Sequence, residues 1–379
     1  MRVGLDGIPL RGIKTGVGHY TFELAQALAR IAPEDEFELI SPFPYPPIRD
    51  DDDESSPSNL GFTQAKVNSL SRRRWWPIGL PLYLKRAPVE LFHGTNYDVP
   101  LWTSRPSVVT IHDLSIILHP ETHDQYLLGR ALRRMPTMAR KAQMIITPSE
   151  SVRGEVCEHL GIKPDKVVAI PHAARRSFSQ ALHSEIVSVT SRLEIEDDFL
   201  LFVGTIEPRK NLLTLVRALE EIYRTTDLRP QLVIAGKEGW QTGEFFSYLK
   251  GVNIRERVRF TGHLPDNDLR AVYSLCRAFI YPSLYEGFGL PLLEAMACGA
   301  PVIASRISSL METAGNAACF VDSQDHRGLA HNIVRVLEDS GERARLSLAG
   351  LQRAREFSWE STAAATLNTY RQVLKKTDG

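Results

Sequence analysis

Short apolar runs alternate with amphipathic stretches along most of this chain. Apolar residues three and four positions apart, such as Leu212, Leu215 and Leu219, predict helices between the runs. The runs themselves have the length of strands, and we expect them to be buried. In chain order they lie at residues 2–5, 37–41, 91–93, 107–111, 144–147, 167–170, 199–203, 232–235, 258–261, 278–281 and 302–304. Strands that alternate with helices predict parallel sheets with helices on both faces.

A polar segment divides the strands into two series. The first series ends near Ala173, and residues 174–197 predict a linker with one surface helix. We therefore expect an α/β protein with two doubly wound, Rossmann-like domains that face a central cleft. Residues 1–175 form the first predicted domain and residues 196–357 the second. A last amphipathic helix is predicted at about 359–376, and it can pack back on the first domain.

Two stretches depart from this pattern. Residues 42–61 carry five prolines and an acidic run from Asp50 to Glu54, which predict a mobile surface loop. Residues 72–86 combine basic and large aromatic side chains and contain no acid. A second basic cluster, at 130–141, lies on a predicted helix and comprises Arg130, Arg133, Arg134, Arg140 and Lys141.

Basic side chains attract anionic headgroups, and tryptophan favours the membrane interface. We therefore hypothesise that the segments at 72–86 and 130–141 contact an anionic membrane or a lipid-linked acceptor. The alternative is ordinary packing of Trp75 and Trp76 beneath a solvated basic face.

Composition narrows the class of protein. Among 379 residues, 45 are basic and 45 acidic, so the formal net charge is zero and gives no reason to expect a nucleic-acid partner. The four cysteines are widely spaced without a CxxC pair, which favours buried free thiols in a reducing compartment. We find no signal peptide and no apolar run of membrane-spanning length. A cytoplasmic location is expected, with peripheral attachment to the inner face of the cytoplasmic membrane as a variant.

Candidate chemistry is concentrated between Glu286 and Glu294, just after the apolar run at 278–281. Two glycines free the backbone to turn, and Pro291 suits the first turn of a short helix. The free N–H groups and the dipole of that helix start favour an anion, while a carboxylate flanks each end of the segment. Such a site suits a ligand with phosphates and sugar hydroxyls. A capped helix with two solvated glutamates is the alternative.

Other polar groups also follow predicted strands. Arg209 and Lys210 stand just ahead of a helix that Asn211 can cap, and two cations beside free N–H groups form an anion site. Solvated cations are the alternative. His112 and Asp113 come at the carboxyl end of a strand, which is the edge that lines the ligand crevice in open parallel sheets.

The loop after the first strand contains Gly16 and Gly18. Because the third glycine of the dinucleotide fingerprint is missing, we expect no nicotinamide cofactor, although the loop can still cradle a phosphate. No DxD-like metal motif has the required context, since the run from Asp50 to Asp53 falls in the predicted mobile loop. We expect neither a metal nor another cofactor.

With these residues in place, the chain resembles the retaining glycosyltransferases of family 4, which have the GT-B fold of two Rossmann-like domains. Their Glu-x-Phe-Gly-x4-Glu signature is matched by Glu286, Phe288, Gly289 and Glu294. Their Gly-x-x-x-Pro-Arg-Lys-Asn element is matched by Gly204, Pro208, Arg209, Lys210 and Asn211. Further agreements are Gly16 and Gly18, His112-Asp113, Pro148-Ser149 and residues 235–240.

The resemblance covers nearly the whole chain, and residues 204–208 and 235–240 are most similar to bacterial mannosyltransferases of O-antigen and exopolysaccharide assembly. One departure is Pro171-His172-Ala173, where the family commonly has Pro-Asn-Gly. The resemblance implies metal-independent transfer of a sugar with retention of configuration. The best candidate is mannose from GDP-mannose, transferred to a glycan or lipid-linked acceptor in lipopolysaccharide or other surface polysaccharide synthesis.

The resemblance also implies a role for each site residue. Arg209 and Lys210 would neutralise the donor diphosphate, and Glu294 would accept hydrogen bonds from the ribose. His112 would contact the transferred sugar from the first domain. The remaining donor-binding positions are Glu286 with the N–H groups of Phe288, Gly289 and Leu290 for the sugar, Gly16 and Gly18 for close approach to the diphosphate, and Gly204.

Three other functions fit parts of this pattern. A nucleotide-sugar epimerase or a phosphorylase would keep the fold and change the chemistry. A catalytically silent sugar-nucleotide binding protein would keep the site without turnover. A hydrolase with paired carboxylates is not suggested, because Glu286 and Glu294 lie along one loop and helix rather than on either face of a bond.

Overall fold

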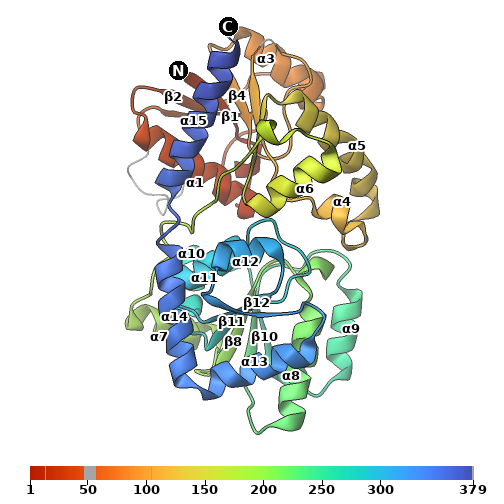
Figure 1. Cartoon of the computed structure of the whole chain (residues 1–379), viewed down its shortest axis with the longest axis vertical. Coiled ribbons are helices and arrows are strands. Elements are labelled where there is room, and N and C mark those ends of the chain that lie inside the picture. Colours follow the sequence, from red (N-terminus) through yellow and green to blue (C-terminus); the bar gives the residue numbers. More distant parts are fainter. Residues whose placement is uncertain (13, 47–56, 104, 378–379) are drawn as a thin grey trace. The chain divides into compact units, whose positions relative to one another are not determined.

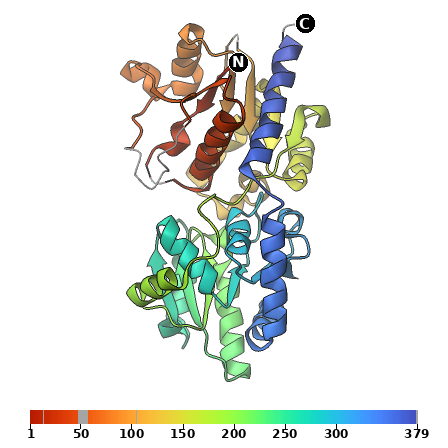
Figure 2. The same ribbon diagram turned by 90° about the vertical axis from the view of Figure 1, so that its left-hand side faces the viewer.

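The computed structural model describes residues 1–12, 14–46, 57–103 and 105–377. It divides into two compact units (Figures 1 and 2). The first comprises Met1–Leu114, Gly129–His172 and Ser358–Gly379, and the second comprises Ser115–Leu128 and Ala173–Phe357. Each unit is a parallel sheet with helices against it, as the alternation of strands and helices predicts.

The sheet of the first unit has seven strands in the order β3-β2-β1-β4-β5-β6-β7. All neighbouring strands run parallel. The strands are β1 (Arg2–Asp6), β2 (Glu36–Ser41), β3 (Leu60–Gln64), β4 (Leu91–Gly94), β5 (Ser107–Thr110), β6 (Met144–Thr147) and β7 (Val167–Ala169). The main helices are α1 (Gly16–Ile31), α2 (Ser69–Arg73), α3 (Leu80–Arg86), α5 (Gln125–Lys141), α6 (Glu150–Leu160) and α15 (Trp359–Thr377).

The sheet of the second unit has six parallel strands in the order β10-β9-β8-β11-β12-β13. They are β8 (Phe199–Val203), β9 (Gln231–Ala235), β10 (Val258–Gly262), β11 (Ala278–Tyr281), β12 (Val302–Ser305) and β13 (Ala318–Val321). The helices are α4 (Ser115–Leu118), α7 (His183–Leu193), α8 (Leu212–Thr225), α9 (Gly243–Gly251), α10 (Asp266–Leu275), α11 (Leu290–Ala297), α12 (Ser308–Ala314), α13 (His326–Glu338) and α14 (Ser340–Ala354).

The central strands explain why these segments read as unbroken apolar runs. Every residue of β4, β5, β6, β9, β11 and β12 is buried. Strands of a parallel sheet with helices on both faces have no solvent side, so both sets of alternating side chains are apolar. Amphipathic helices such as α8 then bury one stripe, which includes Leu215, Leu219 and Ile222.

Two edge strands are absent from the sequence prediction. β3 occupies Leu60–Gln64, so the predicted loop at 42–61 ends earlier than expected, and β13 occupies Ala318–Val321. Each pairs with a single neighbour. In β3 only Leu60 is buried and the other residues are partly or fully exposed, while β13 is apolar throughout and alternates in burial. Much of the predicted loop, including the acidic run Asp50–Glu54, lies outside the described residues.

The division of the chain also differs from the sequence prediction. Ser115–Leu128 belongs to the second unit, although the sequence places it in a domain of residues 1–175. The physical reason is a set of contacts with the loop after β9. The indole Nε1 of Trp240 donates to the carbonyl oxygen of Thr122 at 2.7 Å, and the Gln241 amide donates to that of His123 at 3.2 Å. A further boundary lies between His172 and Ala173, so residues 174–197, which the sequence predicts as a linker with one surface helix, also belong to the second unit.

The C-terminal helix α15 is part of the first unit and lies beside α1 in both views (Figures 1 and 2). The Thr362 hydroxyl donates to the carbonyl oxygen of Pro171 at 2.7 Å, and the buried Tyr370 hydroxyl lies 2.6 Å from Nδ1 of His93. Trp359 is fully buried. The apolar stripe of this helix therefore completes the core of the first unit.

The tryptophans of the basic segment at 72–86 do not form an exposed surface. Trp75 is buried and Trp76 is half-buried, and both pack with Leu80 and Phe92 in a small core. Ordinary packing therefore accounts for these two side chains. Arg72, Arg73, Arg74, Lys85 and Arg86 remain exposed. No helix in the described part of the chain is long and apolar enough to cross a membrane.

Candidate active site

The strand order of the second sheet reverses between β8 and β11. Ligands of open α/β sheets bind beyond the carboxyl ends of the strands at such a reversal. The loop after β8 carries Arg209 and Lys210 in a 3-10 turn, Pro208–Lys210, and the loop after β11 carries Glu286. These residues lie about seventy-five positions apart in the sequence, and the topology of the sheet brings them together.

Lys210 and Glu286 form the centre of this site. Nζ of Lys210 donates to Oε1 of Glu286 at 2.5 Å and to the Tyr281 hydroxyl at 3.1 Å. Arg209 lies beside them, with Nη1 3.1 Å from the second oxygen of Glu286 and Nη2 2.7 Å from Oε1 of Glu207. Two cations and two carboxylates thus share one buried cluster, and the charges of the cluster sum to zero.

Burial and charge act against each other on these groups. Burial raises the pKa of the Glu286 carboxyl, but the charges of Lys210 and Arg209 outweigh it and hold that pKa at about 2. Burial also lowers the pKa of Lys210, and the charge of Glu286 opposes this shift. Both side chains are only 8% exposed. The cluster is therefore an ion-paired, largely dehydrated site rather than the pair of solvated cations that the sequence left open.

The loop between Glu286 and α11 is held in one conformation. The Thr313 hydroxyl donates to the carbonyl oxygen of Phe288 at 2.7 Å, and the Ser309 hydroxyl donates to that of Glu286. Gly289 has φ +92°, and a Cβ there would lie 2.4 Å from the Leu310 side chain. Only glycine satisfies both limits. In the first turn of the helix that starts at Leu290, Pro291 has no N–H and the N–H of Leu292 donates to the carbonyl oxygen of Gly289 at 3.0 Å, so the N–H at the helix start is that of Leu290.

Glu294 has a partner that the sequence did not reveal. Nε and Nη2 of Arg175 donate to its two carboxylate oxygens at 2.7 and 3.0 Å, and Nη1 donates to Asp266 at 2.5 Å. Arg175 and Glu294 are both buried. Arg175 lies three residues after His172 in the polar linker and belongs to no motif, so only the three-dimensional contact identifies it. The solvated-glutamate alternative is wrong for Glu286 and Glu294 alike.

Asn211 does not cap α8 as expected. Its backbone has φ +56°, and its side-chain amide donates to the carbonyl oxygens of Pro282 and Ser323 at 3.0 and 2.7 Å. Thr214 donates to its side-chain oxygen. Asn211 therefore ties the loop after β8 to the loop after β11, which fixes Lys210 opposite Glu286.

Gly204 begins the loop after β8, and its backbone lies close to that of Gly236, which follows β9. A Cβ on Gly236 would lie 1.9 Å from the carbonyl oxygen of Gly204. The ends of β8 and β9 can therefore lie this close only with glycine at Gly236.

The first unit carries a second group of polar residues where its own strand order reverses, between β1 and β4. Nε2 of His112 lies 2.8 Å from the carbonyl oxygen of Thr95. The Thr95 hydroxyl donates to the carbonyl oxygen of Asp6 at 3.0 Å and accepts from the Thr21 hydroxyl at 2.9 Å. Thr95 thereby joins the ends of β1, β4 and β5 to helix α1.

These contacts define the protonation of His112. A carbonyl oxygen only accepts, so Nε2 carries the proton and Nδ1 has the lone pair. Burial lowers the pKa of His112, while the Thr95 carbonyl and Asp113 partly offset this effect. The imidazole is therefore neutral at pH 7, with Nδ1 able to accept a hydrogen bond from a hydroxyl group.

Gly16 and Gly18 lie in the first turn of α1, next to this group. A Cβ on Gly18 would lie 2.8 Å from the carbonyl oxygen of Pro9, whereas a Cβ on Gly16 would meet nothing within 4 Å. Gly18 is thus required by local packing. Among the described residues, no group of three or more His, Cys, Asp or Glu side chains has the arrangement of a metal site.

Comparison with known proteins gives a family to this architecture. The model of "Glycosyltransferase Family 4" matches residues 14–175, and that of "Glycosyl transferases group 1" matches residues 188–353. The chain is also 30% identical to the O-antigen chain mannosyltransferase B of Escherichia coli, over 96% of this chain and 97% of that protein. The chain belongs to glycosyltransferase family 4.

Solved structures agree with this assignment at the level of the fold. Sucrose-phosphate synthase from Thermosynechococcus elongatus superposes with a TM-score of 0.78 at 22% identity, covering 99% of this chain and 100% of that chain. WaaG, a glycosyltransferase involved in lipopolysaccharide biosynthesis, gives 0.71 at 15% identity over 97% and 98% of the two chains. The two Rossmann-like units are thus those of the GT-B fold.

The family membership makes this protein a glycosyltransferase. The predicted residues fall into two groups. Gly204, Arg209, Lys210, Glu286, Phe288, Gly289, Leu290 and Glu294 lie in the second unit, and Gly16, Gly18 and His112 lie in the first. Sequence reasoning missed Glu207, Arg175 and Thr95, which orient the motif residues. Of these three, Glu207 could have been identified from the sequence, because it lies within the Gly-x-x-x-Pro-Arg-Lys-Asn element close to Arg209 and Lys210.

Proposed function

We propose that this glycosyltransferase transfers mannose from GDP-mannose to a glycan or lipid-linked glycan, with retention of configuration and without a metal ion. The relative that matches nearly the whole chain is named as an O-antigen chain mannosyltransferase, which supports the sugar and the surface-polysaccharide context. The chemistry rests on the buried cluster of Arg209, Lys210 and Glu286.

The observation that carries this proposal is the position of two cations beside the first turn of α11. Cleavage of the bond between sugar and diphosphate leaves negative charge on the phosphate oxygens. Arg209, Lys210 and the N–H of Leu290 are positioned donors for that charge, so they stabilise the leaving group without reorganisation. Fixed cations serve here in the place that a divalent metal has in other transferases.

Glu286 has two successive roles in this proposal. In the structure its carboxylate neutralises Lys210 and Arg209. When the diphosphate supplies negative charge to these cations, the carboxylate is free to accept hydrogen bonds from sugar hydroxyls. The low pKa of Glu286 keeps it ionised throughout the physiological range, as an acceptor must be.

The remaining contacts follow from the chemistry of each group. Glu294, held by Arg175, accepts hydrogen bonds from the ribose through the lone pairs that Arg175 leaves available. His112 accepts a hydrogen bond from a hydroxyl of the transferred sugar at Nδ1. Gly16 at the start of α1, where a Cβ would meet nothing, leaves space for backbone approach to the diphosphate.

Retention follows if the acceptor attacks on the face from which the diphosphate departs. The leaving phosphate then takes the proton of the acceptor hydroxyl, and no carboxylate nucleophile is required. A paired-carboxylate mechanism would need Glu286 and Glu294 on either side of the reacting bond, whereas they follow one another along one loop and helix.

The exposed basic residues at 72–74, 85 and 86 support peripheral contact with an anionic membrane at the inner face of the cytoplasmic membrane. Each basic side chain near such a surface contributes about 1 kcal/mol of attraction. The buried Trp75 contributes nothing to it. Flotation with anionic liposomes at low salt measures this contact, and failure to bind would contradict it.

The central test is Lys210→Ala, with the exposed Lys250→Ala on α9 as the matched control. We expect Lys210→Ala to abolish acceptor-dependent release of GDP, while Lys250→Ala retains it. Thermal denaturation with and without GDP separates binding from folding, because a ligand of the native state raises Tm. A Lys210→Ala enzyme with near-normal turnover would refute the site. Release of GDP without acceptor, or a product of inverted anomeric configuration by NMR, would refute the reaction.

A further inference from the structure

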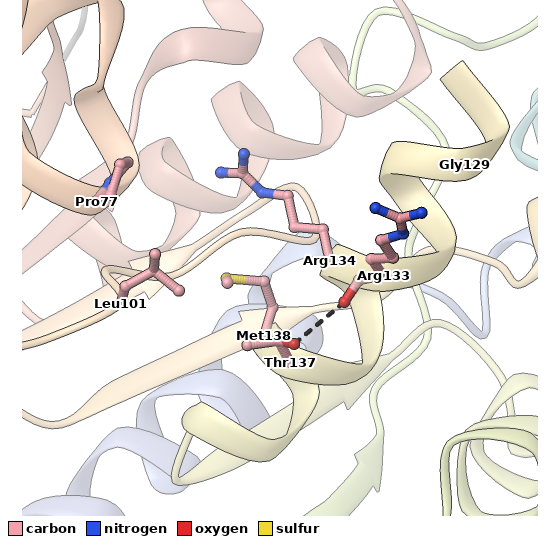
Figure 3. A pocket seen from close by; sticks show the side chains of 7 residues that line it. All are labelled: Pro77, Leu101, Gly129, Arg133, Arg134, Thr137 and Met138. Carbon is pink, nitrogen blue, oxygen red and sulfur yellow. Dashed lines mark hydrogen bonds between the residues drawn. The ribbon is translucent and has the colours of Figure 1, made fainter. Parts of the chain in front are cut away.

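The first unit contains an open pocket of about 530 Å³, and none of the residues that line it belongs to the motifs described above. One wall is formed by Pro77 of the π-helical turn η2 (Trp75–Gly79) and by Leu101. The other wall is formed by one stretch of α5 and comprises Gly129, Arg133, Arg134, Thr137 and Met138. Figure 3 shows the Met138 side chain pointing toward Leu101 and both arginine side chains extending from α5.

The pocket combines an apolar wall with two cations. The side chain of Arg133 is exposed. The hydrogen bond drawn in Figure 3 runs from the Thr137 hydroxyl to the backbone carbonyl oxygen of Arg133, at 3.1 Å, and does not involve the guanidinium. Arg134 pairs through Nε with Asp98, and its guanidinium lies 5.8 Å from the centre of the Trp76 ring. Asp98 balances one of the two cations, so the pocket carries a net positive charge.

The hydrogen bonding of Nη2 of Arg134 indicates the kind of group that the pocket binds. This atom is buried and has no hydrogen-bond partner among the described residues. Buried donors of charged groups are normally satisfied, and one that is not marks a place where a ligand or water supplies the acceptor. Guanidinium groups bind phosphate oxygens with particular strength, because their donors match the spacing of those oxygens.

An exposed aromatic side chain stands beside the pocket. The indole of Trp102 is 53% exposed, and its Nε1 donates to the carbonyl oxygen of Pro77 at 2.6 Å. Leu132, next to Arg133 on α5, is also exposed. Exposed Trp and Leu beside cations are typical of surfaces that meet the boundary between lipid headgroups and acyl chains.

We propose that this pocket binds the phosphoryl group of a long-chain lipid phosphate, the anchor of the acceptor glycan. This inference rests on the proposed transfer to a lipid-linked glycan and names the site and the chemistry of its lipid end. The arginines recognise phosphate oxygens, while Pro77, Leu101 and Met138 contact the first carbons of the chain. A sugar chain alone offers neither the negative charge nor the apolar group that this lining matches.

The decisive experiment is calorimetric titration of the full chain with three probes that differ in one feature each. Farnesyl diphosphate carries the charge and the apolar chain, inorganic pyrophosphate carries only the charge, and farnesol carries only the chain. We expect farnesyl diphosphate to bind at least about fivefold more tightly than either of the other two, since the cationic and apolar contacts each contribute. Equal affinity for pyrophosphate would overturn the lipid part of the proposal.

Arg133→Gln locates the binding in the pocket. Because Arg133 is exposed, the substitution leaves the fold intact, and we expect about fivefold weaker binding of farnesyl diphosphate. The matched control is Arg371→Gln, an exposed arginine of α15 in the same unit. Unchanged affinity in Arg133→Gln would overturn the site, as would an equal loss in both variants, which indicates general charge attraction.

A vesicle experiment distinguishes the lipid anchor from the membrane surface. Binding to phosphatidylglycerol vesicles with no binding of farnesyl diphosphate would overturn the pocket in favour of a headgroup surface. None of these titrations depends on turnover. A failure of the proposed sugar transfer therefore leaves the binding result intact, and a failure of binding leaves the Lys210 result intact.

Discussion

At the scale of single residues, the site is governed by charges that are buried together. Removing one member of a buried pair costs about 3–5 kcal/mol, because the remaining charge is left without a partner. Lys210, Arg209, Glu207 and Glu286 avoid this penalty by balancing one another. In the proposed reaction, an incoming diphosphate adds negative charge beside Lys210 and Arg209, and Glu286 is released from them to accept hydrogen bonds from sugar hydroxyls.

Asp6 provides a residue-scale prediction about pH. Its carboxyl lies at the end of β1 and accepts from the Ile8 N–H at 3.0 Å. Burial raises its pKa from 3.8 to about 8. Between these values the folded protein keeps the proton and the unfolded chain loses it, so stability falls as pH rises through this window. We expect Asp6→Asn to raise Tm by roughly 2 °C or more at pH 8 and to leave Tm unchanged near pH 4.

The control for this measurement is Asp227→Asn, at an exposed aspartate after α8. Differential scanning calorimetry of both variants across pH 4 to 8 gives the comparison. The asparagine amide oxygen can still accept from Ile8, so a loss of that hydrogen bond does not confuse the result. A Tm difference that is constant across the pH range would show that Asp6 does not hold its proton.

Motif residues were the part of the site that sequence could supply, because each motif is local. Each motif pair is close in the sequence: Arg209 precedes Lys210 directly, and Glu286 lies eight positions before Glu294. This short spacing can be recognised without knowledge of the fold. Their partners are not local. Arg175 reaches Glu294 across 119 positions, and no periodicity or spacing marks it. The ion-pair partners of the motif residues can therefore be assigned only from the three-dimensional structure.

At the scale of elements, the strands that form the centres of both sheets follow from apolar runs alone. These strands have helices on both faces, so apolar residues predominate on both sides of each strand, and polar residues lie mainly at the strand ends. β3 lacks this signal because only Leu60 in it is buried, whereas β13 is a short apolar run that the sequence prediction missed. The order of the strands, and hence the switch points that hold Arg209, Glu286 and His112, is not encoded in any local run.

Arg175 gives an element-scale prediction, since it ties the linker to α10 and α11. Arg175→Ala leaves the buried Glu294 without its bidentate partner, which we expect to destabilise the second unit by about 3 kcal/mol or more. Glu294 also loses its fixed orientation. We expect KM for the sugar-nucleotide donor to rise by about tenfold while kcat falls less, because ribose contact is shared by the ground state and the transition state.

The matched control is Arg192→Ala, which breaks the pair between Arg192 of α7 and Asp268 of α10. Arg192 is solvent-exposed, so its pair contributes little to stability. Urea denaturation and steady-state kinetics compare the variants. Arg175→Lys keeps one charge without the two-donor geometry and should recover part of the donor affinity. Equal effects of the two alanine variants would contradict a specific role for Arg175.

At the scale of the whole molecule, the chain passes between the two units four times, at 114/115, 128/129, 172/173 and 357/358. The sequence suggests a simpler division, in which the chain passes once from the first domain to the second and only the C-terminal helix goes back to the first. The extra excursion is Ser115–Leu128, which begins three residues after His112. The ring of His119 packs against that of Tyr285 at 5.3 Å, and the Tyr285 carbonyl accepts from Arg209 at 2.9 Å. The excursion is therefore linked to Arg209 through Tyr285.

Trp240 holds this excursion and provides the last prediction. Its ring stacks on His123 at 6.3 Å, and its Nε1 bonds to the Thr122 carbonyl. Trp240→Ala removes both contacts, so we expect roughly tenfold faster amide hydrogen exchange at residues 119–124. Leu348→Ala, at an exposed side chain on α14, is the control. If the excursion positions His112 for the sugar, Trp240→Ala also lowers kcat while GDP still raises Tm. Unchanged exchange in the variant would mean that backbone bonds alone hold the segment in place.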